Sequence, residues 1–404
     1  MPGLLEGVTV LDLGQYISAP YCARVLADFG ASTIKVEPPA GDVARSMGPF
    51  PEDVPHPERS GLFLALNLNK RGVTLNLHTA EGREILLRMV GTADVVLENY
   101  PPDYLSSLGL EYDAFRKVNP GVILVSITPF GAEGARRDWK ATDLTLFHMG
   151  GFAMNLPGSM GDPDRDPPVR TGGHQSEFLA GTTAVTAVVS ALFQRRRTGR
   201  GCHVDLSTLE GVAGMMSFPE VTRSAFPDDV ATRSRTEPRR GVTAILPCKD
   251  GYVAYSVREQ AQWVQLMELM GNPSWAKEER FLTREQRTEH GNELWQFIAD
   301  WTRTRSKQDL YVTFQSHHIP CFPVNTTADL FQEQQLVHRG FFQEMDHPVA
   351  GKLPYLTFPG HFSNATWRPE RPAPILGQHN IEVLVNSLGY SAQDLPRLAA
   401  AGVI

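Results

Sequence analysis

The chain has 404 residues, of which 42% are hydrophobic and 21% are charged. This ordinary composition excludes disordered, coiled-coil and collagen-like proteins. The formal net charge of −7 excludes a uniformly basic nucleic-acid-binding protein. At about 100–200 residues per domain, the length predicts two or three domains.

The N-terminal third alternates between strand-like and helix-like segments. The expected strands are residues 8–13, 32–37, 73–77, 93–98 and 122–127. The expected helices are residues 19–29 and 79–90. Strands that alternate with helices form right-handed βαβ units, whose strands run parallel. The pattern therefore predicts an α/β fold with a doubly wound sheet.

The second half of the chain has a different pattern. A long apolar helix is expected at residues 177–197, where arginines followed by glycine are typical of a helix C-terminus. After a polar stretch, the segments that we expect are a hairpin at 244–257, helices at 260–270, 285–303 and 306–316, a strand near 347–356 and a helix at 380–388. The hairpin and the three helices after it predict a smaller α+β domain.

Missing motifs argue against several common activities. The sequence has no GxGxxG, P-loop, HExxH or GxSxG pattern, and its four cysteines form no CxxC motif. The histidines lack metal-ligand spacing, so no metal site is expected. The N-terminus has no signal-peptide pattern, and the apolar stretch at 184–192 is shorter than the ~20 residues that span a bilayer. We therefore expect a soluble, cytoplasmic protein without a bound metal.

Glu177 is the candidate reactive group that stands out. It follows a glycine-containing approach, Gly172 and Gly173, at the start of the long apolar helix. A carboxylate there feels the positive end of the helix dipole and can lie beside backbone amides that stabilise an oxyanion. The alternative is that Glu177 only complements the helix start, as acidic residues often do. A second candidate is Gln15, because it follows the first strand, where ligands of open α/β sheets bind.

An ordered set of motifs resembles the family III CoA transferases, also called the CaiB/BaiF family. The resemblance includes relatives that act on formyl-CoA and oxalate, carnitine and benzylsuccinate, and it runs over essentially the whole chain. The segments that carry it are residues 7–13, 19–31, 34–39, 67–77, 94–100, 126–131, 198–205, 249–252, 319–325 and 371–377. One such motif is weak, whereas the ordered set is highly specific for the family.

The resemblance implies a Rossmann-like large domain built from both chain ends. Its two parts are expected at residues 1–218 and 328–404, with the small α+β domain and its linkers at 219–327. Two chains of this family interlock into a dimer. The implied activity is the transfer of CoA from an acyl-CoA to a carboxylic acid, with CoA as a co-substrate and no permanent cofactor. The implied mechanism passes through a carboxylate-bound anhydride and an enzyme–CoA thioester.

The resemblance also assigns site residues by position. Glu177 falls where the family carries its catalytic aspartate, which keeps the carboxylate and lengthens its arm by one methylene. Gln15 matches a position near the thioester, and Asn99 and Lys140 match CoA-contacting positions. Two places where relatives carry arginine hold Ser107 and Pro38, and Thr142 stands where some carry tyrosine. The cations that could replace those arginines at the CoA phosphates are Arg45, Lys70 and Arg71.

Three functions stay open at this point. The leading hypothesis is a CoA transferase with Glu177 as the nucleophile. The second is a non-catalytic subunit that pairs with a homologous chain, as among benzylsuccinate CoA transferases, because Glu177 replaces the usual aspartate. The third is an acyl-CoA racemase, which shares the fold but uses a histidine that has no counterpart in residues 127–130.

Overall fold

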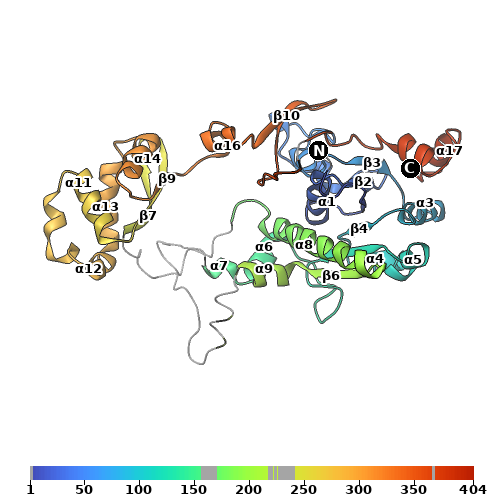
Figure 1. Cartoon of the computed structure of the whole chain (residues 1–404), viewed down its shortest axis with the longest axis horizontal. Helices are drawn as coiled ribbons and strands as arrows, with labels where there is room; N and C mark the ends of the chain where they lie inside the picture. Colours follow the sequence, from blue (N-terminus) through green and yellow to red (C-terminus); the bar gives the residue numbers. More distant parts are fainter. Residues whose placement is uncertain (1–2, 156–170, 217–221, 223–224, 226–241, 366–368) are drawn as a thin grey trace. The chain divides into compact units, whose positions relative to one another are not determined.

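The computed structural model describes residues 3–155, 171–216, 222, 225, 242–365 and 369–404, and these residues form two compact units. The large unit holds residues 3–153, 171–216, 222, 225 and 335–404, so both described chain ends belong to it (Figure 1). The small unit holds residues 154–155 and 242–334. The domain boundary expected at residue 218 lies outside the described residues.

A six-stranded parallel sheet is the centre of the large unit. Its strand order is β3-β2-β1-β4-β5-β6, so β1 pairs with both β2 and β4. The strands are β1 Thr9–Asp12, β2 Ser32–Glu37, β3 Arg71–Thr74, β4 Val95–Glu98, β5 Ile123–Thr128 and β6 His203–Ser207. From β1 the chain first adds β2 and β3 on one side of the sheet, and then β4, β5 and β6 on the other side. This topology confirms the predicted α/β class and creates a switch point between β1 and β4.

Helices cover both faces of this sheet. On one face, α1 (Ser18–Asp28) and α8 (Gln175–Thr198) bury alanines and branched aliphatic residues against β1, β4 and β5. On the other face, α3 (Ala80–Val90), α5 (Tyr112–Val118) and α17 (Asp394–Ala400) complete a second core. The remaining helices of the unit are α2 Gly61–Leu66, α4 Tyr104–Ser107, α6 Asp143–Met149, α9 Thr208–Met216 and α16 Gln334–His338.

Helix α8 is the one described helix with the length and apolar composition to cross a bilayer. It starts two residues before its expected position and ends at Gly199, whose φ of 69° is the left-handed conformation that glycine adopts readily. Here it packs against α1 and buries Ala180, Ala184, Val188, Ala191 and Leu192 in the core of the large unit, whereas Val189 and Phe193 are exposed. Arg195 near its end pairs with Asp94 at 2.6 Å, which gives that arginine a structural role.

The C-terminal segment completes the edge of the large sheet. Asn380 accepts from the Thr74 backbone N–H at 2.9 Å, and the Asn76 N–H donates to the Val403 carbonyl. Strand β3 ends at Thr74, three residues before the expected residue 77. The strand expected near 347–356 is a hairpin of β10 (Phe342–His347) and β11 (Gly351–Leu356), and the expected helix at 380–388 is a π-helix over Ile381–Ser387.

The small unit has its own three-stranded antiparallel sheet, β7-β8-β9. The strands are β7 Val242–Cys248, β8 Gly251–Val257 and β9 Cys321–Pro323. The helices are α11 Gln260–Leu269, α12 Arg284–Glu289, α13 Gly291–Thr302, α14 Lys307–Ser316 and α15 Thr327–Leu330. Helix α7, Phe152–Asn155, lies where the chain passes from one unit to the other. The expected helix at 285–303 is therefore two helices, broken at His290. The break precedes Gly291, a residue that weakens a continuous helix.

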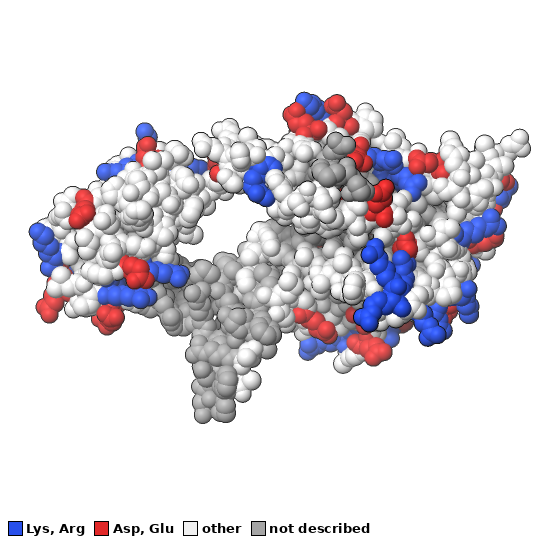
Figure 2. Space-filling model, viewed as in Figure 1, with Lys and Arg blue, Asp and Glu red and all other residues white. Residues whose placement is uncertain are grey.

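Charged side chains of both signs are interspersed on the face shown in Figure 2, where no single basic surface covers the described residues. This distribution agrees with the negative net charge of the chain. Binding through a broad positive surface, as in nucleic-acid-binding proteins, is not indicated on this face.

Candidate active site

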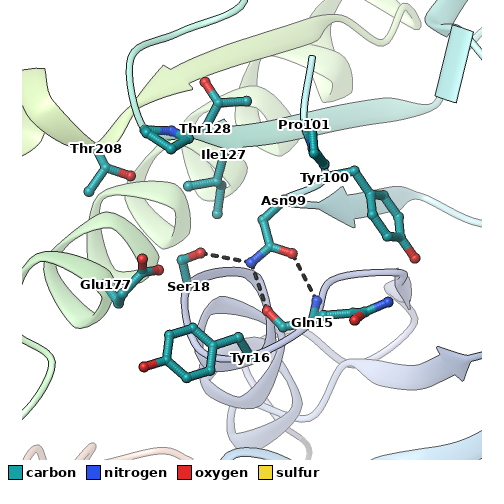
Figure 3. Close-up of a pocket in the computed structure, with 11 residues that line it drawn as sticks. Gln15, Tyr16, Ser18, Asn99, Tyr100, Pro101, Ile127, Thr128, Glu177 and Thr208 are labelled. Carbon is teal, nitrogen blue, oxygen red and sulfur yellow. Dashed lines mark hydrogen bonds between the residues drawn. The ribbon is translucent and has the colours of Figure 1, made fainter. Parts of the chain in front are cut away.

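A cavity of about 270 Å³ opens at the carboxyl ends of β1, β4 and β5. It lies at the switch point of the sheet, where ligands of doubly wound folds bind. Its lining comes entirely from the large unit and is shown in Figure 3: Gln15, Tyr16, Ser18, Asn99, Tyr100, Pro101, Ile127, Thr128, Pro129, Glu177 and Thr208. The cavity thus joins three residues that the sequence proposed, namely Gln15, Asn99 and Glu177.

Asn99 fixes the loop that carries Gln15. The Gln15 backbone N–H donates to Asn99 Oδ1 at 2.8 Å, and Asn99 Nδ2 donates back to the Gln15 carbonyl at 2.7 Å. Asn99 follows β4 directly, and β4 is the parallel neighbour of β1, so the two residues meet at one edge of the sheet. Gln15 and Tyr100 both line the cavity.

A cluster of buried charged residues also fixes the loop after β1 that carries Gln15. Lys35 Nζ donates to Asp42 Oδ2 at 2.6 Å and also to the Gly14 carbonyl. Asp42 Oδ1 accepts from the Tyr16 backbone N–H at 3.0 Å, and Tyr16 has a φ of 67°. A non-glycine residue in this conformation persists only where its surroundings hold it, as the cluster does here.

Glu177 lies in the first turn of α8, partly exposed to the cavity. Its carboxylate lies beside Ser18, the first residue of α1, and both residues line the cavity. Burial raises the pKa of Glu177, the nearby Asp143 raises it further, and Ser18 opposes the rise. The carboxylate therefore stands at the N-terminal ends of two helices, whose dipoles favour its negative charge.

Asp143 also secures the start of α8. Its Oδ1 accepts from the Ser176 backbone N–H at 2.7 Å, while its Oδ2 is buried without a hydrogen-bond partner among the described residues. Next to it, the Tyr16 hydroxyl bonds to His174 Nδ1 at 3.0 Å, which links the loop after β1 to the N-cap of α8. These contacts fix the helix turn that carries Glu177.

The cations proposed for CoA phosphates do not line the cavity. Arg45 is 3% exposed and makes a two-armed ion pair with Glu37, at 2.7 and 2.8 Å. Lys70 is fully buried and donates to Asp12 Oδ2 at 2.8 Å. Both side chains are thus occupied within the protein, because the sheet places acidic strand residues beside them.

The two remaining cations are accessible but lie elsewhere. Arg71 is on the edge strand β3 and pairs with Glu382 at 3.1 Å. Lys140 is exposed in the loop before α6 and is outside the lining. Ser107, where relatives carry arginine, is on α4 and donates to the Tyr104 carbonyl at 2.7 Å.

Sequence reasoning missed five polar lining residues, Tyr16, Ser18, Tyr100, Thr128 and Thr208. Each lies at or shortly after the end of a strand or at the start of a helix, which was the one signal that could have marked them. Such positions are polar in most α/β proteins, so polarity there does not distinguish site residues from other loop residues.

Comparison with known proteins assigns the chain to a family. The family model for CoA-transferase family III matches residues 5–380. The chain belongs to CoA-transferase family III. Succinate–glutarate CoA-transferase from Agrobacterium fabrum is 31% identical, with 94% of each chain covered. Subunit BbsE of succinyl-CoA:(R)-benzylsuccinate CoA-transferase from Thauera aromatica is 32% identical, with 95% of this chain and 94% of that one covered.

A solved structure supports the same assignment. A CaiB/BaiF family protein from Brucella suis superposes with a TM-score of 0.86 at 30% identity, covering 96% of this chain and 100% of the other. The resemblance read from the sequence motifs is confirmed, and so is the status of the chain as an enzyme. As a family III CoA-transferase, it uses CoA thioesters as co-substrates.

Proposed function

We propose that this enzyme moves CoA from an acyl-CoA to a free carboxylic acid with Glu177 as its nucleophile. The observation that carries the proposal is the Glu177 carboxylate at the cavity, in the first turn of α8 and beside the start of α1. A carboxylate held beside backbone N–H groups can attack a thioester while donors stabilise the oxyanion that forms.

The reaction proceeds in four balanced steps. Glu177 attacks the thioester carbonyl, a C–O bond forms, the C–S bond breaks and CoA thiolate leaves an acyl–glutamyl anhydride. The thiolate attacks the glutamyl carbonyl, which gives an enzyme–CoA thioester and frees the donor acid. The acceptor carboxylate attacks this thioester and forms a second anhydride with loss of the thiolate. The thiolate then attacks the acceptor's acyl carbonyl, which forms the new acyl-CoA and restores Glu177.

The surrounding residues have separate parts in this scheme. The N-terminal end of α1, where Ser18 stands, supports the charge on the attacking carboxylate. Asn99 keeps the loop of Gln15 in place, so the Gln15 amide meets the thioester region of a bound ligand. Lys140 contacts the CoA portion from the loop before α6. No metal or permanent cofactor takes part.

The assembly in this proposal is an interlocked dimer in the cytoplasm. The resemblance to CaiB/BaiF proteins supports it, and the partner is a second copy or a homologous chain. The acids are carboxylic acids of the kind that the relatives' names include, such as succinate and glutarate. Sedimentation of the purified chain measures whether the 44.7 kDa polypeptide forms a particle of twice that mass.

The first test traps the enzyme-bound intermediate. The enzyme is incubated with succinyl-CoA and then with borohydride or hydroxylamine, and the modified residue is mapped by mass spectrometry. A reduced or hydroxamate-modified Glu177 is expected, and Glu177→Gln should lose both the adduct and more than about 1000-fold in kcat. Transfer that survives in Glu177→Gln without any adduct contradicts the assignment.

Two other functions remain hypotheses. A non-catalytic subunit is favoured by the similarity to BbsE, which is one subunit of its enzyme. Activity of the chain purified alone argues against that role, and an active homologous chain that co-purifies argues for it. An acyl-CoA racemase would wash deuterium into the α-carbon of an acyl-CoA without any acceptor acid.

A further inference from the structure

Tyr16 is a cavity-lining residue whose ring and backbone are both held in place. Its hydroxyl lies 3.0 Å from His174 Nδ1, and the two rings meet edge to face with their centroids 5.4 Å apart. At its other end, the Tyr16 backbone N–H donates to Asp42 Oδ1 at 3.0 Å, with φ at 67°. A side chain that is fixed at its tip and at its backbone has little freedom to turn aside for a ligand.

The two residues that hold Tyr16 are themselves fixed by the fold. Asp42 is 3% exposed, and Lys35 Nζ donates to its Oδ2 at 2.6 Å. His174 is the N-cap residue of α8, shortly before Glu177. The Tyr16 side chain therefore joins a buried ion pair of the large unit to the helix turn that carries Glu177.

The Tyr16 ring bounds the cavity on the side of the α8 N-terminus, where its hydroxyl meets His174. In the view of Figure 3, the ring lies on one side of Glu177, and the side chains of Thr128 and Thr208 lie on the other. All of these residues except His174 line the same cavity. A ligand that brings a thioester carbonyl to Glu177 must therefore share this cavity with the ring.

The chemistry of a thioester indicates which group such a ring limits. The carbonyl that Glu177 attacks bears two groups, the sulfur of CoA and the acyl chain. The pantetheine arm of CoA is the same in every substrate, whereas the acyl chain differs from acid to acid. A size limit at this carbonyl therefore selects between acids. One methylene more or less in an enclosed pocket changes kcat/KM by about 10-fold to 200-fold.

We propose that Tyr16 is a specificity-determining residue that restricts this enzyme to short acyl groups, and that His174 is a positioning residue that holds the Tyr16 ring in the cavity. This rests on the CoA transfer and on the role of Glu177 proposed above. The ring acts by its volume, and its hydroxyl, bonded to His174, takes no part in the steps that make and break bonds.

The first test compares Tyr16→Ala with Tyr252→Ala, a matched substitution on β8 of the small unit, where Tyr252 is 55% exposed. Succinyl-CoA is the donor, and glutarate, adipate and suberate are the acceptors. In the parent enzyme, kcat/KM should fall by more than about 100-fold from glutarate to suberate. Tyr16→Ala should reduce this ratio by at least about 10-fold, and Tyr252→Ala should leave it unchanged. A ratio that Tyr16→Ala does not change overturns the proposal.

A second pair of variants separates the ring from its hydroxyl. Tyr16→Phe keeps the ring and removes the hydroxyl, and His174→Ala removes the partner of that hydroxyl. Each should reduce the glutarate-to-suberate ratio by about threefold, and the double variant should reduce it no further, because both lose the same bond. With glutarate, Tyr16→Phe should keep kcat within about threefold of the parent, whereas a loss of more than about 100-fold would show that the hydroxyl takes part in the chemistry and would overturn the proposal.

A third readout does not depend on turnover. Calorimetry in a Glu177→Gln background measures the dissociation constants of glutaryl-CoA and suberyl-CoA. Addition of Tyr16→Ala should shift their ratio in favour of suberyl-CoA by at least about 10-fold. If the ratio shifts while Glu177→Gln still transfers CoA, Tyr16 limits the acyl group as proposed and the nucleophile has been misassigned. An unchanged ratio overturns the role of Tyr16, whichever residue is the nucleophile.

Discussion

Glu98 is a buried carboxyl beside the cavity that the proposed chemistry does not use. It ends β4, is 6% exposed and accepts from the Tyr100 backbone N–H at 2.7 Å. Burial raises the pKa of Glu98 to about 7, against a hydrogen bond from Ser126, and Asp205 adds to the rise. The fold thus holds a carboxyl that titrates near neutral pH because little water reaches it.

This raised pKa makes stability depend on pH in a defined direction. Below about pH 4, Glu98 is protonated in both states, and as the pH rises through 7 the folded state must bear a buried charge. Glu98→Gln should therefore stabilise the protein at pH 8 by up to about 3 kcal/mol, with the gain fading toward pH 4.5. Urea unfolding at pH 8 and pH 5 measures this difference.

A surface glutamate provides the control for that experiment. Glu84 on α3 is well exposed and pairs with Arg88 at 2.8 Å. Glu84→Gln should change the free energy of unfolding by less than about 0.5 kcal/mol at either pH, because exposed ion pairs contribute little. A Glu98→Gln variant that is less stable at pH 8 than at pH 5, relative to the parent, contradicts the assignment of a charged, costly Glu98.

Helices α1 and α8 approach closely at Gly181, one turn after Glu177. A Cβ placed there would lie 2.7 Å from the Ser18 carbonyl oxygen and 2.9 Å from Tyr21 Cδ1. The backbone of α1 cannot yield to such a contact as a flexible side chain could. This glycine therefore sets the distance between the helix that carries Ser18 and the helix that carries Glu177.

Gly181→Ala should force the two helices apart. Overpacking of this kind costs about 1–3 kcal/mol of stability, and the displaced Glu177 should lose at least about 10-fold in kcat. Gly214→Ala on α9 is the matched control, since a Cβ there meets nothing within 4 Å and should gain up to about 1 kcal/mol from helix propensity. Thermal unfolding and kcat of both variants check this. Equal effects of the two substitutions would refute a role for the close approach.

In the large unit, the C-terminal segment contacts residues from the N-terminal part of the chain. Residues 371–404 bond to Asn69, the edge strand β3 and Asn76, and Leu398 and Val403 enter the core beside α3. The small unit has a separate core in which Trp263 is buried and Trp275, Trp295 and Trp301 are partly buried. Within the described residues, each unit therefore contains the apolar contacts that a cooperative fold requires.

Deletion of residues 371–404 should unfold the large unit and leave the small unit folded. The large unit loses the cover of β3 and part of its core, so its far-ultraviolet signal and CoA transfer should be lost. Tryptophan fluorescence should still report a folded small unit, which holds four of the six tryptophans. Arg397→Ala, which removes only an exposed pair with Glu81, is the control and should behave as the parent does. Loss of both signals together would show that the small unit depends on the large one.

Local sequence patterns predicted most of the secondary structure of the large sheet and its first helices. Alternating apolar runs predicted all but the last strand of the six-stranded sheet, and the helix expected at 79–90 is α3, which Thr79 caps. The parallel class followed because short strands separated by helices have few ways to pair. The break at His290, the early end of β3 and the β10–β11 turn were missed. The helix break coincides with Gly291, which weakens a continuous helix.

The sequence by itself determined the family, the α/β class and the carboxylate at the start of the long helix, because motif order and periodicity are local properties of the chain. Only the tertiary structure decided which polar groups meet. The register of β1 beside β4 brings Asn99 to Gln15 and Ser18, and the approach of α1 to α8 brings Ser18 to Glu177. The same packing buries Arg45 and Lys70 in ion pairs with Glu37 and Asp12. A buried cation without a carboxylate partner is costly, so these two side chains pair within the protein and not with a ligand.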